Sequence, residues 1–221
     1  MTALTGGLLG IAAVAAVVDW GAVWIDGPRS RMVERVAKPA VLVALVLAAL
    51  AWPMADGGSV LVRVLLVAAL VASLAGDVFL LSPRRFIPGL VAFLLGHIAY
   101  TIAFAQLQGS APWLLAGIAA AAVVVLTVGR ALVRAAHREG LGMPVAVYLV
   151  AICAMAIAAT RTGMPVAIVG AWLFVASDSM LGWGQFRAPA EGSDRGAARL
   201  RLAVIVTYHL GQVLLLLALV G

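Results

Sequence analysis

The chain has 221 residues, of which 65% are hydrophobic and 11% are charged, with 15 basic and 9 acidic residues. A soluble domain carries about a quarter charged residues, so this chain has too little polar surface to cover a water-soluble globule, and it is too apolar to be disordered. The composition leaves a multi-pass membrane protein, which we expect to form one all-α domain over residues 1–221.

Eight stretches are apolar over the roughly 20 residues that a helix needs to cross a bilayer. In chain order, these stretches are residues 3–25, 38–55, 60–82, 88–108, 112–132, 143–161, 164–184 and 200–220. No basic residue precedes the first stretch, so we expect a retained helix and not a cleaved signal peptide. Polar and apolar residues do not alternate along the stretches, which argues against a membrane β-barrel. The pattern predicts a bundle of eight transmembrane helices.

The basic residues are distributed unevenly over the connections between these stretches. Two of the 15 lie on the side of the chain termini, Arg63 and Arg161. The others lie in the four connections on the opposite side: Arg29, Arg31, Arg35, Lys38, Arg84, Arg85, Arg130, Arg134, Arg138, Arg187, Arg195, Arg199 and Arg201. Positive charge marks cytoplasmic connections, so we expect both termini on the outer side of the inner (plasma) membrane. Because the charges are spread over short connections, no nucleic-acid partner is expected.

Two aspartates lie inside predicted spans, where an ionisable residue costs about 2.5–3.5 kcal/mol and is a functional candidate by default. Asp77 and Asp178 both come shortly before the predicted cytoplasmic ends of their helices. At about 1.5 Å of rise per residue, each would lie roughly 8 Å below that end. Other polar residues of the spans are expected in the same half of the bilayer: Lys38, His97, Tyr100, Tyr148, Tyr208, His209 and Gln212. This clustering predicts a polar cavity that opens to the cytoplasmic leaflet.

A structural role stays open for some of these residues. Interhelical hydrogen bonds in membranes contribute about 0.6 kcal/mol each, and this role is favoured for Tyr148, Gln212 or a serine taken alone. Asp19, at a comparable depth, is either functional or the partner of a connecting arginine. Trp20 and Trp24 beside it fit an interfacial aromatic belt.

Other kinds of site find little support. His137, one of three histidines, falls in a basic connection, and the single cysteine, Cys153, lies in an apolar stretch, so no metal site is expected. Ser177 and Ser179 flank Asp178 without the G-x-S-x-G turn of a serine hydrolase.

Two weaker patterns concern symmetry. Residues 74–81 are similar to residues 175–181, and a phenylalanine follows each, Phe86 and Phe186. This similarity indicates either a four-plus-four repeat in one orientation or chance in a chain rich in Ala, Leu and Val. The Gly6–Gly10 segment is a G-x-x-x-G motif, a weak indication of a homodimer.

The chain resembles the YhhN-like family of integral membrane proteins, which includes the lysoplasmalogenases, over nearly its whole length. The resemblance rests on these residues in this order: Lys38-Pro39, Gly76-Asp77, Gly96-His97, Tyr100, Tyr148, Ser177-Asp178-Ser179, Tyr208 and Gln212. It implies an eight-helix enzyme that hydrolyses the vinyl ether bond of lysoplasmalogens to a fatty aldehyde and a glycerophospho-ethanolamine or -choline. The glycine-rich segment 180–184 departs from the family pattern, as does His209, to which we assign no role.

Vinyl ether hydrolysis suits two carboxyl groups in different protonation states. One acid delivers a proton to carbon, and an ionised carboxylate stabilises the oxocarbenium-like cation and then orients water, by analogy with glycoside hydrolysis. We expect Asp77 and Asp178 to form this catalytic pair, with the two roles unassigned, and Lys38 to hold the phosphate of a lysophospholipid. The remaining substrate-binding candidates are His97, Tyr100, Tyr148, Ser177, Ser179, Tyr208 and Gln212. The reaction needs no cofactor and no metal.

A transporter or proton-coupled carrier for a small molecule or lipid is the alternative, because membrane carboxylates also serve proton relays. A transport route needs polar residues across both leaflets or broken helices at the midplane, and the outer half of these spans has almost none. A purely structural membrane protein fits the two aspartates least well.

Overall fold

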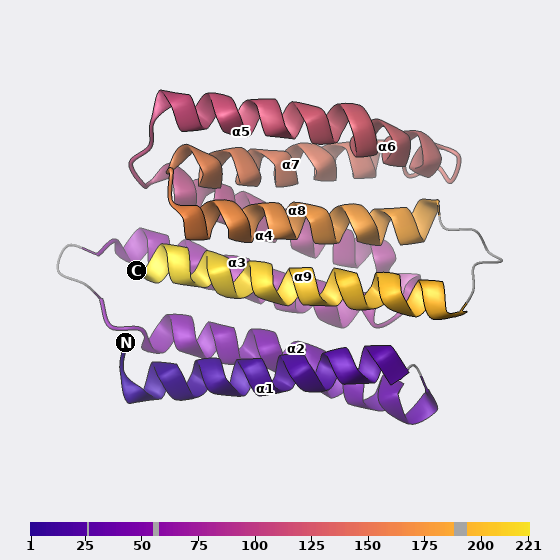
Figure 1. Cartoon of the computed structure of the whole chain (residues 1–221), viewed down its shortest axis with the longest axis horizontal. Helices are drawn as coiled ribbons and strands as arrows, with labels where there is room; N and C mark the ends of the chain where they lie inside the picture. The colour runs from indigo at the N-terminus through magenta and orange to yellow at the C-terminus, as the bar shows by residue number, and fades with distance from the viewer. Residues whose placement is uncertain (26, 55–57, 188–193) are drawn as a thin grey trace.

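The computed structural model describes residues 1–25, 27–54, 58–187 and 194–221, and these residues form an antiparallel helical bundle without β-strands (Figure 1). Helix bounds, in chain order, are α1 Ala3–Ile25, α2 Pro28–Ala51, α3 Val60–Leu80, α4 Phe86–Ala105, α5 Ala111–Val124, α6 Arg130–His137, α7 Gly142–Arg161, α8 Pro165–Phe186 and α9 Asp194–Val220. A 3₁₀ turn at Pro83–Arg85 precedes α4. A π-helical turn at Val125–Gly129 joins α5 and α6 into one continuous helix.

Seven helices in the described part of the chain are long and apolar enough to cross a membrane, which identifies a multi-pass membrane protein. They are α1, α3, α4, the continuous helix Ala111–His137, α7, α8 and the Gly196–Val220 part of α9. The predicted span at residues 38–55, in α2, is the exception. This helix begins at Pro28, well before the predicted start, and its first half carries three arginines, Glu34 and Lys38, so only its second half is apolar. Proline favours such a start because its missing N–H is not needed in the first helical turn.

Some predicted connections are helical. Eight arginines expected in connections lie on helices instead: Arg29, Arg31, Arg35, Arg130, Arg134, Arg195, Arg199 and Arg201. The helix α6 shows why, since Leu132 and Ala136 are buried on one face while arginines extend from the other. An amphipathic segment of this kind continues a helix beyond its apolar part, and hydropathy alone places the helix end too early.

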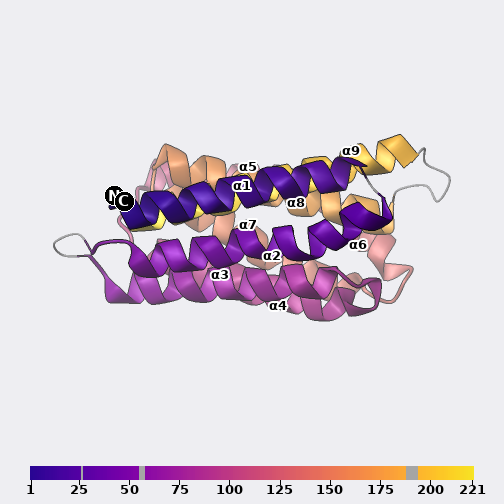
Figure 2. The same cartoon turned by 90° about the horizontal axis from the view of Figure 1, so that it is seen from below.

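The two ends of the bundle differ in charge, as the sequence predicts. The last residues of α1, α3, α6 and α8 lie at the end of the bundle opposite to the two termini (Figures 1 and 2). Most basic residues are at this end, which we call the basic end, whereas Arg63 near the start of α3 and Arg161 at the end of α7 are at the terminal end. Which side of the membrane the basic end faces stays a prediction.

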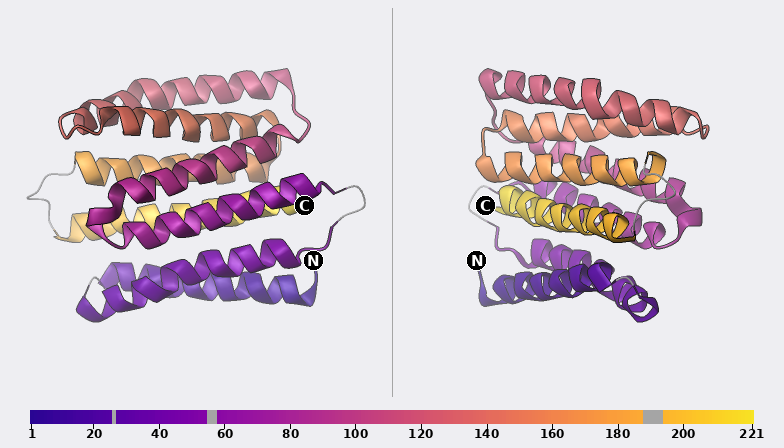
Figure 3. Two further views of the ribbon diagram at one scale, coloured as in Figure 1. Left: turned by 180° about the vertical axis from the view of Figure 1, so that it is seen from behind. Right: turned by 45° about the vertical axis from the view of Figure 1, so that its right-hand side comes forward.

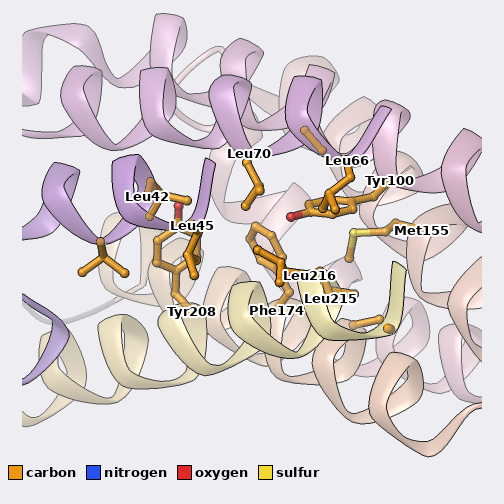
Figure 4. Packing of buried hydrophobic residues seen from close by; sticks show 14 of the residues in the cluster. Leu42, Leu45, Leu66, Leu70, Tyr100, Met155, Phe174, Tyr208, Leu215 and Leu216 are labelled. Atoms are coloured by element: carbon orange, nitrogen blue, oxygen red, sulfur yellow. The ribbon is translucent and has the colours of Figure 1, made fainter. Parts of the chain in front are cut away.

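The helix α9 packs against four others, α1, α2, α3 and α8. Seen from behind, α3 and α4 cross in front of α8 and α9 (Figure 3, left). In the resulting core, the ring of Phe174 on α8 lies 5.3 Å from the ring of Tyr208 on α9, centroid to centroid (Figure 4). The backbones of α8 and α9 approach closely at Gly170 and Gly211. A Cβ atom on Gly211 would lie 3.0 Å from the carbonyl oxygen of Gly170, closer than Cβ atoms ordinarily come, so this approach favours glycine.

The structure bears on the possible repeat and on the Gly6–Gly10 motif at one position each. The rings of Phe86 and Phe186, which follow the two similar segments, meet edge to face with centroids 5.8 Å apart. A Cβ on Gly10 would meet no atom within 4 Å, so this part of α1 is open for a neighbour. The repeat and the homodimer stay predictions.

Candidate active site

A cavity of about 60 Å³ lies between α4, α7, α8 and the helix from α5 to α6, toward the basic end. Its wall is mostly apolar and includes Phe93 and Leu132. The polar side chains that line it are Tyr148, Asp178 and Ser179. An apolar cavity with a few convergent polar groups is the usual form of a small-molecule site, and we call this one the Asp178 cavity.

Asp178 is held through one of its two carboxyl oxygens. The Tyr148 hydroxyl donates a hydrogen bond to Oδ2, and His97 Nε2 lies 3.7 Å from the same oxygen, too far for a hydrogen bond. Among the described residues, Oδ1 has no hydrogen-bond partner, and neither does either ring nitrogen of the buried His97. The Asp178 side chain is 11% exposed, so this carboxyl group can exchange a proton with a molecule in the cavity.

Asp77 is held through both oxygens, in a second cluster formed by α2, α3 and α9. Lys38 Nζ lies 3.2 Å from Oδ1, and the Tyr208 hydroxyl donates a hydrogen bond of 2.9 Å to Oδ2. The Asp77 side chain is 1% exposed. A charge buried this deeply is stable only when it is paired and hydrogen-bonded, and Lys38 and Tyr208 meet that requirement.

Aromatic rings lie between the two carboxyl clusters. The Phe174 ring is 4.8 Å from the His97 ring and 5.3 Å from the Tyr208 ring, centroid to centroid. Asp77 is near enough to interact electrostatically with Asp178. No hydrogen bond joins them within the described ranges, however, and Asp77 is not part of the cavity wall. The two aspartates therefore occupy adjoining sites and not the single shared pocket that the sequence predicts.

Most other predicted site residues make buried contacts away from the cavity. The Tyr100 hydroxyl donates a hydrogen bond of 2.6 Å to Gln212 Oε1, which joins α4 to α9. The Ser177 hydroxyl donates to the backbone carbonyl of Val204 at 3.0 Å. Ser179, two residues further along α8, does line the cavity. The hydrogen bonds of Tyr100 with Gln212 and of Ser177 with Val204 join neighbouring helices, which is the structural role that the sequence leaves open for Gln212 and the serines.

Asp19, Trp20 and Trp24, near the basic end of α1, lie in different surroundings. Asp19 is fully buried, and neither carboxyl oxygen has a hydrogen-bond partner in the part of the chain that the structure describes, although Lys38 and Arg201 are near enough to interact with it electrostatically, so its role stays a prediction. Trp20 is partly buried and donates its indole N–H to His209 Nδ1 at 3.1 Å, which ties α1 to α9. Trp24 is 56% exposed, as a belt residue would be.

Sequence reasoning missed the apolar wall of the cavity and the π-helical turn beside it. Gly129 ends this turn and lines the cavity, and a Cβ there would lie 2.6 Å from Cδ2 of Leu149. One more apolar residue in an apolar chain gives no signal, although π-helical turns are frequent at functional sites. Among the described residues, no three His, Cys, Asp or Glu side chains come together as a metal site would require.

Comparisons with known proteins place this geometry in context. The model of the YhhN family matches residues 33–219. Human lysoplasmalogenase TMEM86B is 33% identical over 181 residues, which cover 80% of this chain and 72% of the human protein. The lysoplasmalogenases of Mycobacterium bovis and Mycobacterium tuberculosis are each 36% identical over 163 residues, which cover 70% of this chain and 60% of theirs. No solved structure shows significant similarity to the chain.

Proposed function

Because this chain belongs to the YhhN family, we propose that it is a membrane-embedded hydrolase that cleaves the vinyl ether bond of lysoplasmalogens, the substrates for which its human and mycobacterial relatives are named. The products would be a fatty aldehyde and a glycerophospho-ethanolamine or -choline. The cavity would face the cytoplasmic side of the inner (plasma) membrane, because the basic end of the bundle would lie there. The observation that carries the proposal is a carboxyl group, Asp178, in the wall of an apolar cavity.

Asp178 would act as the general acid. It would give its proton to the β-carbon of the vinyl ether, and the carboxylate that remains would stabilise the cation shared between the α-carbon and the ether oxygen. Water then adds to the α-carbon, and the hemiacetal breaks at the bond to the glycerol oxygen, which leaves as an alcohol. The proton that the added water loses returns to the Asp178 carboxylate, and the proton of the hemiacetal hydroxyl passes to the departing glycerol oxygen, so the acid is restored for the next turnover. The apolar wall would hold the reacting end of the alkenyl chain.

Asp77 would act as a positioning residue. Its contacts with Lys38 and Tyr208 tie α3 to α2 and α9, and the Tyr208 ring packs on Phe174, which in turn contacts His97. Lys38 largely neutralises the charge of Asp77. The Asp77 carboxylate would therefore fix the positions of the helices around the cavity and contribute little to the electrostatic potential inside it. Since its ammonium group is already paired, Lys38 ceases to be our candidate for the substrate phosphate.

The test is aldehyde release by the purified chain in neutral detergent. We expect the wild type to release a fatty aldehyde from an alkenyl lysophospholipid and none from its saturated ether analogue, which has no double bond to protonate. Asp178→Asn should lower the rate by about 100-fold or more, the usual contribution of a general acid. Asp19→Asn, which alters a buried carboxyl group outside the cavity, should retain activity. No aldehyde from the wild type, or full activity in Asp178→Asn, would overturn the proposal.

A further inference from the structure

A second hollow lies at the basic end, beside the Asp178 cavity. It measures about 350 Å³ and is lined by Ala131, Arg134, Ala135, Arg138, Phe186 and Arg187. We call it the arginine groove. Arg134 extends from α6 and Arg138 follows its last turn, whereas Arg187 follows the last residue of α8, so two separate segments bring three guanidinium groups to one place.

The charges of the groove have no anionic partner in the part of the chain that the structure describes. No ion pair or hydrogen bond engages the guanidinium groups of Arg134, Arg138 or Arg187 there. Arg187 instead stacks on the ring of Trp183, at 4.6 Å from the centroid, which orders the side chain and leaves its N–H groups free to donate. Arg161, by contrast, donates hydrogen bonds from Nη2 to backbone carbonyls such as that of Leu107.

The groove and the cavity adjoin. Phe186 lines both, and Leu132 of the cavity wall directly follows Ala131 of the groove. Asp178 lies on α8, and Arg187, just beyond the end of this helix, follows nine residues later, which corresponds to about 13 Å along the helix axis. The glycerol unit of a lysolipid and an extended arginine side chain together span a distance of this order. A molecule whose vinyl ether reached Asp178 would therefore carry its phosphate to the groove.

We propose that the arginine groove binds the phosphate of the single-chain phospholipid whose alkenyl end enters the Asp178 cavity. The inference rests on the proposed function and assigns it a headgroup site. Guanidinium groups suit this ligand because their planar pairs of N–H groups match two phosphate oxygens at once. Several guanidinium groups together also neutralise the negative charge of the phosphate. The zwitterionic ethanolamine or choline would extend past the groove. Orientation in the bilayer also requires basic residues at this end, so the test must separate a specific site from general positive charge.

The test compares two triple variants that remove the same charge from the same end. R134Q/R138Q/R187Q empties the groove, whereas R29Q/R35Q/R199Q removes three exposed arginines of α2 and α9, and α2 lies across the bundle from α6 (Figure 1). Binding is measured on the full chain in neutral detergent with two uncleavable probes: a 1-O-alkyl lysophosphatidylcholine and a 1-O-alkylglycerol, which lacks the phosphate.

We expect the groove variant to bind the phosphate-bearing probe about 10- to 100-fold more weakly than the wild type and the alkylglycerol equally well. The control variant should bind both probes like the wild type. Unchanged affinity in the groove variant, equal losses in both triple variants, or displacement of the probe by inorganic phosphate at equal concentration would overturn the site. Aldehyde release is assayed separately, so tight groove-dependent binding without hydrolysis would refute the proposed function and leave the phosphate site standing.

Discussion

Tyr148 on α7 donates its hydroxyl hydrogen to Oδ2 of Asp178 on α8, and Oδ1 of the same carboxyl group has no hydrogen bond among the described residues. One oxygen is thus held in position while the other is available to carry a proton. This asymmetry distinguishes Asp178 from Asp77, whose two oxygens are both engaged.

Removing the Tyr148 hydroxyl should therefore impair the reaction more than the fold. We expect Tyr148→Phe to lower kcat for an alkenyl lysophospholipid by about 10- to 100-fold, because a hydrogen bond to an ionised group contributes about 1.5–3 kcal/mol. Steady-state aldehyde release gives kcat, and circular dichroism gives helix content. Tyr100→Phe is the control, since it removes a hydroxyl that is buried on α4 and bonded to Gln212 away from the cavity. Equal losses in the two variants would contradict a role for Tyr148 at the reacting centre.

The ion pair of Lys38 and Asp77 should matter chiefly for stability. Asp77→Asn leaves the Lys38 ammonium group unpaired, and breaking a buried pair costs about 3–5 kcal/mol, so we expect a lower temperature of thermal unfolding in neutral detergent. The double variant Lys38→Met/Asp77→Asn should recover much of that loss, because it removes both charges.

The matched control for this pair is Glu34→Gln. It breaks the ion pair with Arg201, whose side chain is 42% exposed, so the loss should stay below about 1 kcal/mol. A double variant that is less stable than Asp77→Asn alone would contradict the pairing.

Filling the Asp178 cavity should block substrate entry. Val145 on α7 lines this cavity, whereas Val147 on the same helix is 48% exposed on the outer surface. We expect Val145→Trp to raise KM at least tenfold, or to abolish aldehyde release, and Val147→Trp to change neither kcat nor KM by more than about twofold. Activity at the wild-type level in Val145→Trp would mean that the reaction takes place elsewhere.

The contact of α8 with α9 should tolerate no side chain. Gly211→Ala would bring a Cβ to 3.0 Å from the carbonyl oxygen of Gly170, so α8 and α9 must shift by a few tenths of an ångström, and we expect a cost of about 1–3 kcal/mol. In Gly21→Ala, the added Cβ meets no atom within 4 Å, and this variant should be as stable as the wild type or slightly more so. Thermal unfolding in detergent compares the two, and a destabilised Gly21→Ala beside an unaffected Gly211→Ala would refute the close approach.

Hydropathy alone predicts much of the bundle. The bounds of α1 agree with the first apolar stretch, 3–25, and α7 and α8 begin and end within two residues of prediction. The start of α2 and the extension through α6 are missed because charged residues continue a helix once it leaves its apolar part. The chain resembles its family through polar residues, and the family model confirms that resemblance.

The candidate site is less accessible to sequence reasoning. Two aspartates in apolar helices are conspicuous, but their position along α3 and α8 does not reveal which neighbours each will meet. Pairing of Asp77 with Lys38, and of Asp178 with Tyr148, depends on the rotation of four helices about their axes. The weak amphipathicity of membrane helices gives little information on this rotation. In the sequence, Arg134 and Arg187 likewise look like basic residues that only orient the protein in the membrane. The fold brings both to one groove.

The small volume of the Asp178 cavity limits what the protein can recognise. About 60 Å³ accommodates a handful of water-sized groups, far fewer than the methylenes of a fatty chain. Most of a bound tail would thus remain outside, among the acyl chains of the surrounding bilayer. Turnover should then vary little with tail length, and the membrane itself would serve as the reservoir from which successive molecules diffuse sideways to the protein.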